Sequence, residues 1–204
     1  MDQIDWGIVI FNLISVTGFW GLMVIRLFQL SRMGVKPTMM SSKSRSKNII
    51  ELVIYYGLFI TWSFFLVANA LVKFDFFLFT PFWNPPALQI YITLILAAAF
   101  QILMWIAIYT MGASYRIGHE DANVGDLITN GIFSKGRNPI YFGMDGLVVC
   151  AFLEQPNVFF LTFAVLTVVM FHFMILREEK GLREKYGAQY EEYLENTKKY
   201  FLFF

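Results

Sequence analysis

The chain has 204 residues, of which 57% are hydrophobic and 15% charged, and its mean hydropathy is +0.56. This is more apolar surface than a soluble domain of such length can hide, so the composition excludes an ordinary soluble fold. The formal net charge of +1 gives no reason to expect a nucleic-acid partner, and the single cysteine, Cys150, excludes an internal disulfide and a multi-cysteine metal cluster.

Five apolar segments are candidate membrane spans, because a bilayer core of about 30 Å needs about 20 apolar residues in a helix. In chain order they are Trp6–Leu30, Ile49–Val72, Ala87–Met111, Ile140–Leu153 and Val158–Leu176. The first lacks the basic start of a signal peptide and is too long for one, so it is interpreted as a retained span. The fourth has about 14 residues, or roughly 21 Å of helix, and crosses a full core only with help from its flanks.

The last two spans are predicted to form an antiparallel hairpin, because the polar turn Glu154–Asn157 separates them. A re-entrant pair of segments in their place would preserve the topology. The sequence therefore predicts an all-α polytopic membrane protein with five transmembrane helices and a C-terminal helical hairpin.

Positive charge predicts the orientation of these spans. With five spans, all lysines and arginines except Arg26 and Lys73 fall on one side: Arg32, Lys36, Lys43, Arg45, Lys47, Arg116, Lys135, Arg137, Arg177, Lys180, Arg183, Lys185, Lys198 and Lys199. The positive-inside rule then places the N-terminus outside and the C-terminus in the cytoplasm. Arg26, near the charged end of the first span, is expected to snorkel to the interface.

Standard signatures of soluble enzymes are missing. The sequence has no G-x-G-x-x-G or G-x-x-x-x-G-K-[ST] loop, no H-E-x-x-H pair and no G-x-S-x-G elbow. We therefore predict no metal site, and any active site must use another construction.

Polar residues at the start of the fourth span are the first candidates for such a site. Pro139 suits the first helical turn and Asn138 the N-cap, where the helix N-terminus favours an anionic ligand group. The structural alternative is a simple cap beside a snorkelling Arg137. Asp145 lies further inside the apolar helix, and both function and structural pairing explain an ionisable residue there.

Two carboxylates at the end of the fifth span are further candidates. Glu179 shares a helix face with His172 and is expected to pair with Arg183 at i,i+4 on a solvated helix. Glu178 has Leu182 at i+4 and hence no such partner, which makes it the carboxylate more available to a ligand.

These residues carry a resemblance to a known family. Its motifs R-[HN]-P-x-Y, E-E-x-x-L and [FY]-G-x-x-Y-x-x-Y are similar to Arg137–Tyr141, Arg177–Leu182 and Tyr186–Tyr193, and its lead-in L-[VI]-T-x-G-x-[FY] is similar to Leu127–Phe133. Over about its last ninety residues the chain thus resembles the isoprenylcysteine carboxyl methyltransferase family of integral membrane enzymes. Asn138 stands where eukaryotic members have histidine, and the tail Lys199–Phe204 lacks the more usual proline.

The resemblance implies a carboxyl O-methyltransferase that uses S-adenosylmethionine from the cytosol and a lipid-modified substrate, such as a prenylated cysteine, from the bilayer. By position, the cofactor contacts are Asp126, Leu127, Ile128, Phe133, Asn138, Pro139, Ile140, Tyr141 and Glu178. Arg137 or Arg177 is expected to orient the acceptor carboxylate. One membrane domain, 1–204, would comprise three spans in 1–111 and a cofactor-binding part in 112–204.

Rival functions remain open at this point. A phospholipid or small-lipid N-methyltransferase would use the same cofactor but needs a base for its amine acceptor, which makes Glu179 or Asp145 more important. A related membrane reductase family has a similar C-terminal half and uses a nicotinamide cofactor. A non-enzymatic scaffold would bind lipids or a partner through its basic loops and would bind no cofactor.

Overall fold

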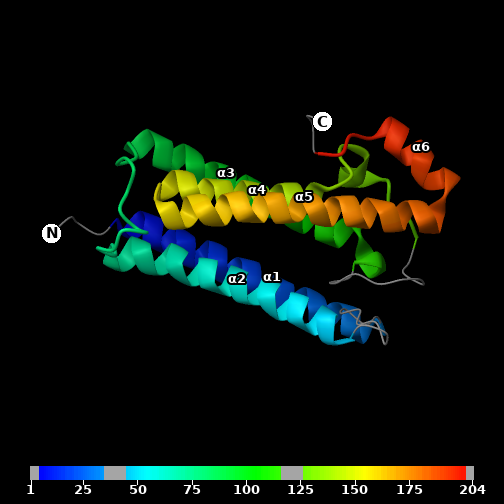
Figure 1. Cartoon of the computed structure of the whole chain (residues 1–204), viewed down its shortest axis with the longest axis horizontal. Coiled ribbons are helices and arrows are strands. Elements are labelled where there is room, and N and C mark those ends of the chain that lie inside the picture. Colours follow the sequence, from blue (N-terminus) through cyan, green and yellow to red (C-terminus); the bar gives the residue numbers. More distant parts are fainter. Residues whose placement is uncertain (1–4, 35–44, 116–125, 201–204) are drawn as a thin grey trace.

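The fold is a bundle of long helices in a computed structural model that describes residues 5–34, 45–115 and 126–200 (Figure 1). The described part contains no strand. Its elements are α1 (Trp6–Arg32), α2 (Arg45–Val72), α3 (Ala87–Thr110), the 3-10 helices η1 (Gly112–Ser114) and η2 (Gly131–Ser134), α4 (Pro139–Glu154), α5 (Val158–Tyr186) and α6 (Ala188–Asn196).

The predicted apolar segments are helical, and three of these helices, α1, α3 and α5, are long and apolar enough to cross a membrane. Large apolar side chains on them face outward, among them Ile14, Ile95, Leu166 and Phe173, which suits a lipid surrounding. The described side chains of α2 give a shorter apolar stretch, Tyr56–Val72, and α4 has only 16 residues. The protein is therefore an all-α integral membrane protein, and a count of five spans remains a prediction.

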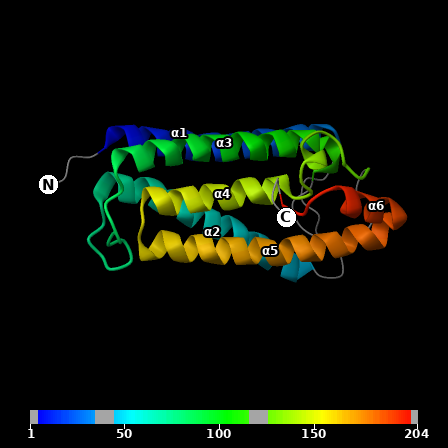
Figure 2. The ribbon, with the colours of Figure 1, turned by 90° about the horizontal axis from the view of Figure 1, so that it is seen from above.

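α4 and α5 form the predicted antiparallel hairpin (Figure 2). The Asn157 side chain accepts a hydrogen bond from Phe160 N and caps α5. Glu154, expected only as a polar turn residue, is buried and accepts hydrogen bonds from Asn12 of α1 at 2.6 Å and from Gln155 at 3.1 Å. Gln155 in turn accepts from Asn69 of α2 at 2.7 Å, so amide side chains tie the hairpin turn to the first two helices.

α3 packs closely against α4 because two glycines let the helices approach. A Cβ atom at Gly143 would lie 2.9 Å from both the Met104 Cβ and the Phe100 carbonyl oxygen. At Gly146 it would lie 2.4 Å from the Phe100 ring. Small residues at helix contacts are the usual means of close packing between membrane helices.

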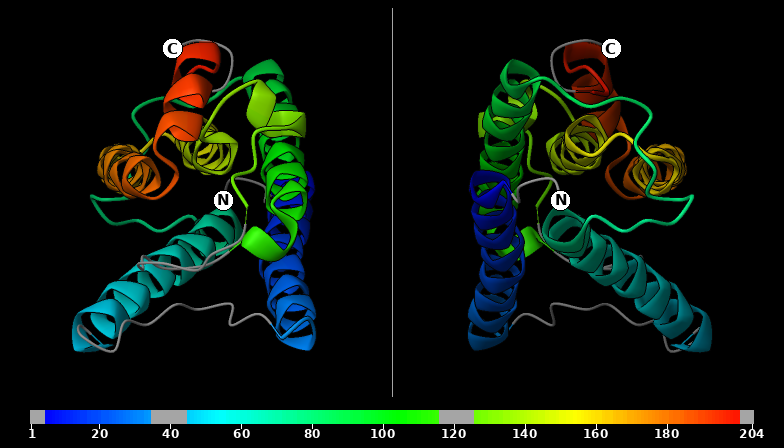
Figure 3. Two further views of the ribbon diagram at one scale, coloured as in Figure 1. Left: turned by 90° about the vertical axis from the view of Figure 1, so that its right-hand side faces the viewer. Right: turned by 90° about the vertical axis from the view of Figure 1, so that its left-hand side faces the viewer.

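α1 and α2 diverge toward Arg32 and Arg45, the ends that lie on the α6 side of the molecule (Figure 3). At this same side α5 continues as one helix to Tyr186, where Gly187 with a φ of 50° ends it and α6 begins. The start of α4, the end of α5 and α6 therefore meet at one end of the bundle.

Candidate functional site

The start of α4 is the centre of the candidate site. Pro139 occupies the first turn, as predicted, and Asn138 occupies the N-cap position. The expectation that the Asn138 side chain caps the helix is wrong, because it makes no capping hydrogen bond. Its Nδ2 instead donates to the Lys199 carbonyl oxygen at 3.0 Å and to Glu179 Oε1 at 3.4 Å. The side chain is thus drawn to the C-terminal segment, and the first-turn N–H groups of α4 receive no cap from it.

Arg137 and Glu179 form a buried ion pair with an Nη2–Oε1 distance of 3.1 Å, and both side chains are 9% exposed. Lys199 adds a second cation, with its Nζ 3.3 Å from Glu179 Oε2. The predicted pairing of Glu179 with Arg183 on a solvated helix is therefore wrong. Arg183 instead pairs with Glu191 of α6 at 3.3 Å, on the exposed surface.

Arg137 also binds the backbone at the end of α6 and just after it. It donates to the carbonyl oxygens of Leu194, at 3.3 Å, and of Thr197, while the Arg137 backbone N–H donates to the Lys198 carbonyl at 2.9 Å. These bonds fix residues 194–199 beside the start of α4, so the main contacts of Arg137 lie within the protein.

Glu178 is half-buried and accepts a hydrogen bond of 2.6 Å from the Tyr141 hydroxyl. It therefore has a partner across the hairpin that i,i+4 spacing on its own helix does not reveal. The Tyr141 ring in turn makes an edge contact with Phe171, at 5.1 Å between centroids. Two adjacent carboxylates thus contact different neighbours: Glu179 holds the C-terminal segment, and Glu178 holds Tyr141.

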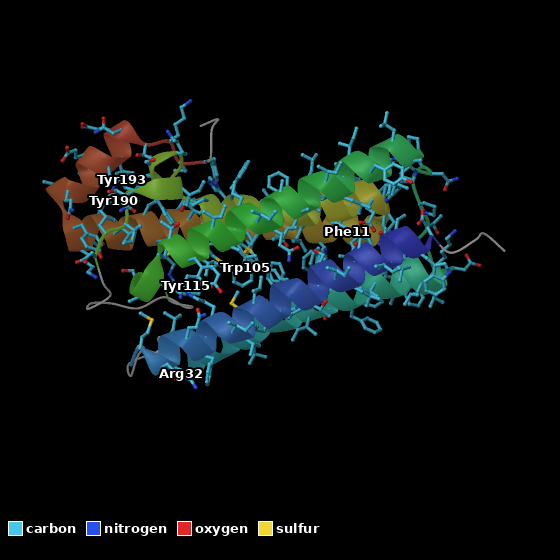
Figure 4. The ribbon with its side chains drawn as sticks, turned by 180° about the vertical axis from the view of Figure 1, so that it is seen from behind. Phe11, Arg32, Trp105, Tyr115, Tyr190 and Tyr193 are labelled. Carbon is cyan, nitrogen blue, oxygen red and sulfur yellow. The ribbon has the colours of Figure 1, made fainter. Side chains whose placement is uncertain are left out.

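α6 holds the loop before α4. The Tyr193 hydroxyl donates to the Phe133 carbonyl oxygen of η2 at 2.6 Å, and Phe133 is buried. Burial raises the pKa of Tyr193, so its phenol is a protonated donor at neutral pH. In Figure 4, Tyr190 and Tyr193 lie on α6 beside η2.

The other residues predicted to contact the cofactor lie at the same end of the bundle but differ in their exposure to solvent. Leu127 and Ile128 are half-buried, whereas Asp126 is exposed and its carbonyl accepts a hydrogen bond from Ser114 of η1 at 3.4 Å. Ile140 packs on the cluster of Phe19, Leu30, Met104, Trp105, Ile108 and Tyr115. Arg177 lies on the exposed face of α5.

Sequence reasoning missed the role of the segment after α6. The Tyr200 phenol hydrogen-bonds His172 Nδ1 and stacks on its ring, with an interplanar angle of 24°. Burial, followed by the nearby charges of Asp145 and Glu179, raises the pKa of Tyr200. Asp145 Oδ1 is buried, and within the described part of the chain it has no hydrogen-bond partner. The departure of the tail from the family pattern was the one signal that pointed to this segment.

No group of three or more histidine, cysteine, aspartate or glutamate side chains able to hold a metal occurs among residues 5–34, 45–115 and 126–200. The donors and acceptors of the site are instead a carboxylate, phenols, backbone N–H groups and guanidinium groups. Such a set fits an organic zwitterion with hydroxyl groups better than a metal ion.

The fold is that of an α-helical integral membrane protein with a cluster of polar residues, the candidate site, at one end of a helical hairpin. Residues 88–189, half of the chain, match the family described as phospholipid methyltransferase, and the chain belongs to this family. This family belongs to a larger group of integral membrane proteins, the isoprenylcysteine carboxyl methyltransferase-like family. The resemblance seen in the sequence is therefore confirmed. No curated protein and no solved structure matches the chain.

The protein is therefore a membrane methyltransferase, and its family implies S-adenosylmethionine as the methyl donor. The matched segment contains α4, α5, all of α3 except Ala87, and every residue predicted to contact the cofactor. Neither the match nor the fold distinguishes among lipid acceptors.

Proposed function

We propose that the protein transfers a methyl group from S-adenosylmethionine to the polar group of a lipid at the membrane surface. The observation that carries this proposal is the hydrogen bond between Tyr141 and Glu178, at 2.6 Å, within the first turn of α4. It joins the two helices of the hairpin within the segment that matches the family.

The residues at this end have the chemistry that such a cofactor requires. The first turn of α4 presents N–H groups and the positive end of a helix dipole to a carboxylate. Glu178 accepts hydrogen bonds from hydroxyl or amino groups. In the proposal the cofactor contacts are those expected from the sequence: Asp126, Leu127, Ile128, Phe133, Asn138, Pro139, Ile140, Tyr141 and Glu178.

The reaction depends mainly on the alignment of the methyl group with its acceptor. Bound S-adenosylmethionine supplies an electrophilic methyl group, and a carboxylate acceptor is a competent nucleophile without a base. The chain must then hold the acceptor in line and exclude water, which are proximity effects. Of the two arginines expected to orient the acceptor, Arg177 is the better candidate because it lies on the exposed face of α5, whereas Arg137 is buried beside Glu179 and the C-terminal segment. The first candidate product is a methyl ester on a lipid-linked carboxylate, such as that of a prenylated cysteine.

A second candidate is methylation of a phospholipid amine. Two observations favour it: the description of the matched family, and the buried Oδ1 of Asp145, which has no hydrogen-bond partner among the described residues. An amine is protonated at neutral pH, and a carboxylate inside the hairpin is a suitable proton acceptor.

We also propose five membrane spans, with the N-terminus outside and the site at the cytoplasmic surface. Supporting this arrangement, the start of α4, the end of α5 and most of the described positive charges lie at the same end of the bundle. The acceptor would then enter sideways from the bilayer with its polar group toward that surface.

The test is transfer of a labelled methyl group by the detergent-purified protein. One arm supplies a farnesylated cysteine analogue, and the other supplies phosphatidylethanolamine in mixed micelles. Label released by base as volatile methanol identifies an ester, whereas base-stable label in the lipid fraction identifies an amine. Failure to label either acceptor, with cofactor binding intact, would contradict a lipid acceptor of these two kinds.

A further inference from the structure

A buried arginine of α1 lies outside the site described so far. Arg26 is only 5% exposed, so the expectation that it snorkels to the interface is wrong. Its Nη2 donates to the Gly112 carbonyl oxygen, its Nη1 lies 3.4 Å from Gln29 Oε1, and its guanidinium carbon lies 5.2 Å from the centroid of the Tyr109 ring.

The charge of Arg26 is not neutralised by these contacts. A carbonyl, an amide and an aromatic ring surround it, and none of the three carries a negative charge. Its Nε is buried and has no hydrogen-bond partner in the described part of the chain. Burying a charged group without a counter-charge is costly, and buried arginines are normally paired with an anion.

A purely structural role accounts for only part of this arrangement. The bond to Gly112 joins α1 to η1, and the contact with Tyr109 joins α1 to α3. A neutral donor such as glutamine would provide the first of these contacts without the cost of a buried charge. The guanidinium offers five N–H donors in a planar fork that suits carboxylate and phosphate oxygens.

Arg26 also lies toward the candidate cofactor site. Tyr115, which follows η1, contacts Met23 of α1 through its hydroxyl at 3.8 Å and belongs to the apolar cluster on which Ile140 packs. Figure 4 shows Tyr115 at the end of α3, beside α1. Burial raises the pKa of Tyr115, and so does the nearby Tyr56; Arg26 then lowers this pKa and Glu178 raises it. Arg26 and Glu178 are therefore both within electrostatic reach of one phenol.

We propose that Arg26 binds the anionic group, phosphate or carboxylate, of an amphiphilic acceptor at the part of α1 that faces η1 and the end of α3. The inference rests on the proposed function for the identity of this ligand as the acceptor. It assigns substrate binding to α1, a helix that the family match, which starts at residue 88, does not include.

The experiment measures the rise in melting temperature of the detergent-solubilised protein on addition of ligand. The probes are dodecyl phosphate and a farnesylated cysteine analogue with a free carboxylate, with neutral dodecanol as the apolar control. We expect at least one anionic probe to raise the melting temperature of the wild-type protein and dodecanol not to do so. A rise with dodecyl phosphate alone indicates a phosphate-bearing lipid, and a rise with the cysteine analogue alone indicates a carboxylate.

Arg26→Gln should abolish the rise produced by the anionic probe, while the rise produced by S-adenosylhomocysteine persists. The matched control is Arg32→Gln, which removes one positive charge from the exposed end of the same helix and should retain both effects. A merely structural Arg26 would lower the starting melting temperature but leave the rise with the anionic probe, and that result would overturn the proposal. The proposal would also be overturned if neither anionic probe raised the melting temperature of a wild-type protein that binds S-adenosylhomocysteine.

Arg26→Lys keeps the charge and is the variant to measure if Arg26→Gln does not fold. It should retain a smaller rise with the anionic probe, because a lysine keeps the charge but not the bidentate geometry. An undiminished rise in Arg26→Lys would contradict recognition of the anion by the guanidinium and would overturn the proposal. If S-adenosylhomocysteine has no effect on any variant, the proposed function fails, whatever the anionic probes do.

Discussion

At the residue scale, two neighbouring carboxylates of α5 perform different tasks. Glu179 is held by Arg137 and Lys199 and anchors the C-terminal segment, whereas Glu178 accepts the Tyr141 hydroxyl. Consecutive residues of a helix lie about 100° apart around its axis, so these side chains reach different neighbours. Each task can be tested separately.

Breaking the buried pair should destabilise the protein strongly. Glu179→Ala leaves the buried Arg137 guanidinium without its counter-charge, and we expect a loss of about 3–5 kcal/mol in the free energy of unfolding. Glu191→Ala is the matched control, because it breaks the exposed ion pair with Arg183, whose side chains are 55% and 56% exposed. Denaturation in mixed micelles measures both variants, and an equal, small effect would show that the Glu179 pair is not buried as described.

Removing the Tyr141 hydroxyl should weaken the cofactor site without unfolding the hairpin. Tyr141→Phe removes the hydrogen bond from the Tyr141 hydroxyl to Glu178, and we expect a loss of about 1–3 kcal/mol in the binding free energy of S-adenosylhomocysteine. Tyr91→Phe, at an exposed position of α3, is the control and should not change the affinity. Calorimetric titration compares the two, and unchanged affinity in Tyr141→Phe would move the site away from this pair.

The sequence predicted which residues are chemically interesting better than it predicted their partners. It singled out Asn138, Tyr141 and Glu178, and the structure gathers them at one end of the hairpin. It could not predict that Asn138 bonds the carbonyl of Lys199, because this contact joins residues 61 positions apart. Helix spacing reports only neighbours within a turn or two, so the i,i+4 partner expected for Glu179 was the wrong one.

At the scale of elements, the contact between α3 and α4 depends on a glycine face. Gly143→Ala would place a methyl group 2.9 Å from a backbone oxygen, which cannot move as a flexible side chain can. We expect a loss of roughly 1–3 kcal/mol in unfolding free energy, the usual cost of overpacking.

The matched control for this glycine is Gly181→Ala in α5, where nothing lies within 4 Å of the added Cβ. Alanine is the better helix former, so this variant should be as stable as the wild type or more stable by up to about 1 kcal/mol. Melting temperatures of both variants, measured in one detergent, check the pair. Similar stability of the two variants would contradict the close packing of α3 on α4.

Helices were predictable from the sequence because apolar runs of this length have few alternatives in a membrane. Their ends were not all predictable in the same way. Hydropathy places the end of the last span at Leu176, where charges begin, but α5 remains helical to Tyr186 and brings Glu178 and Glu179 to the site on a rigid element. The amide network around Glu154 also escaped prediction, since its members come from three different helices.

At the scale of the whole molecule, the site lies at the end of the bundle opposite the α4–α5 turn and the α2–α3 connection (Figure 1). Five spans require that these two ends face opposite sides of the membrane. In a Cys150→Ser background, Asp75→Cys and Arg183→Cys place single cysteines at exposed positions of the two ends. A membrane-impermeant thiol reagent applied to intact cells should label the first and not the second, and labelling of both from the same side would contradict the topology.

The family and its class of reaction were predictable, because motifs in a fixed order carry them. The burial of Arg26 was not predictable from the sequence. An arginine six residues from the end of a long apolar helix looks the same in sequence whether it snorkels or turns inward. Only the position of η1 beside α1 distinguishes the two.

The proposed binding of S-adenosylmethionine at this end of the bundle is tested by titration calorimetry of the purified wild-type protein. S-adenosylhomocysteine, the product of the cofactor, should bind with a stoichiometry of about one per chain if the cofactor binds at the candidate site. Reduced nicotinamide dinucleotide, titrated in parallel, should give no binding heat. Binding of the nicotinamide with no heat from S-adenosylhomocysteine would contradict the account and assign the site to the reductase class.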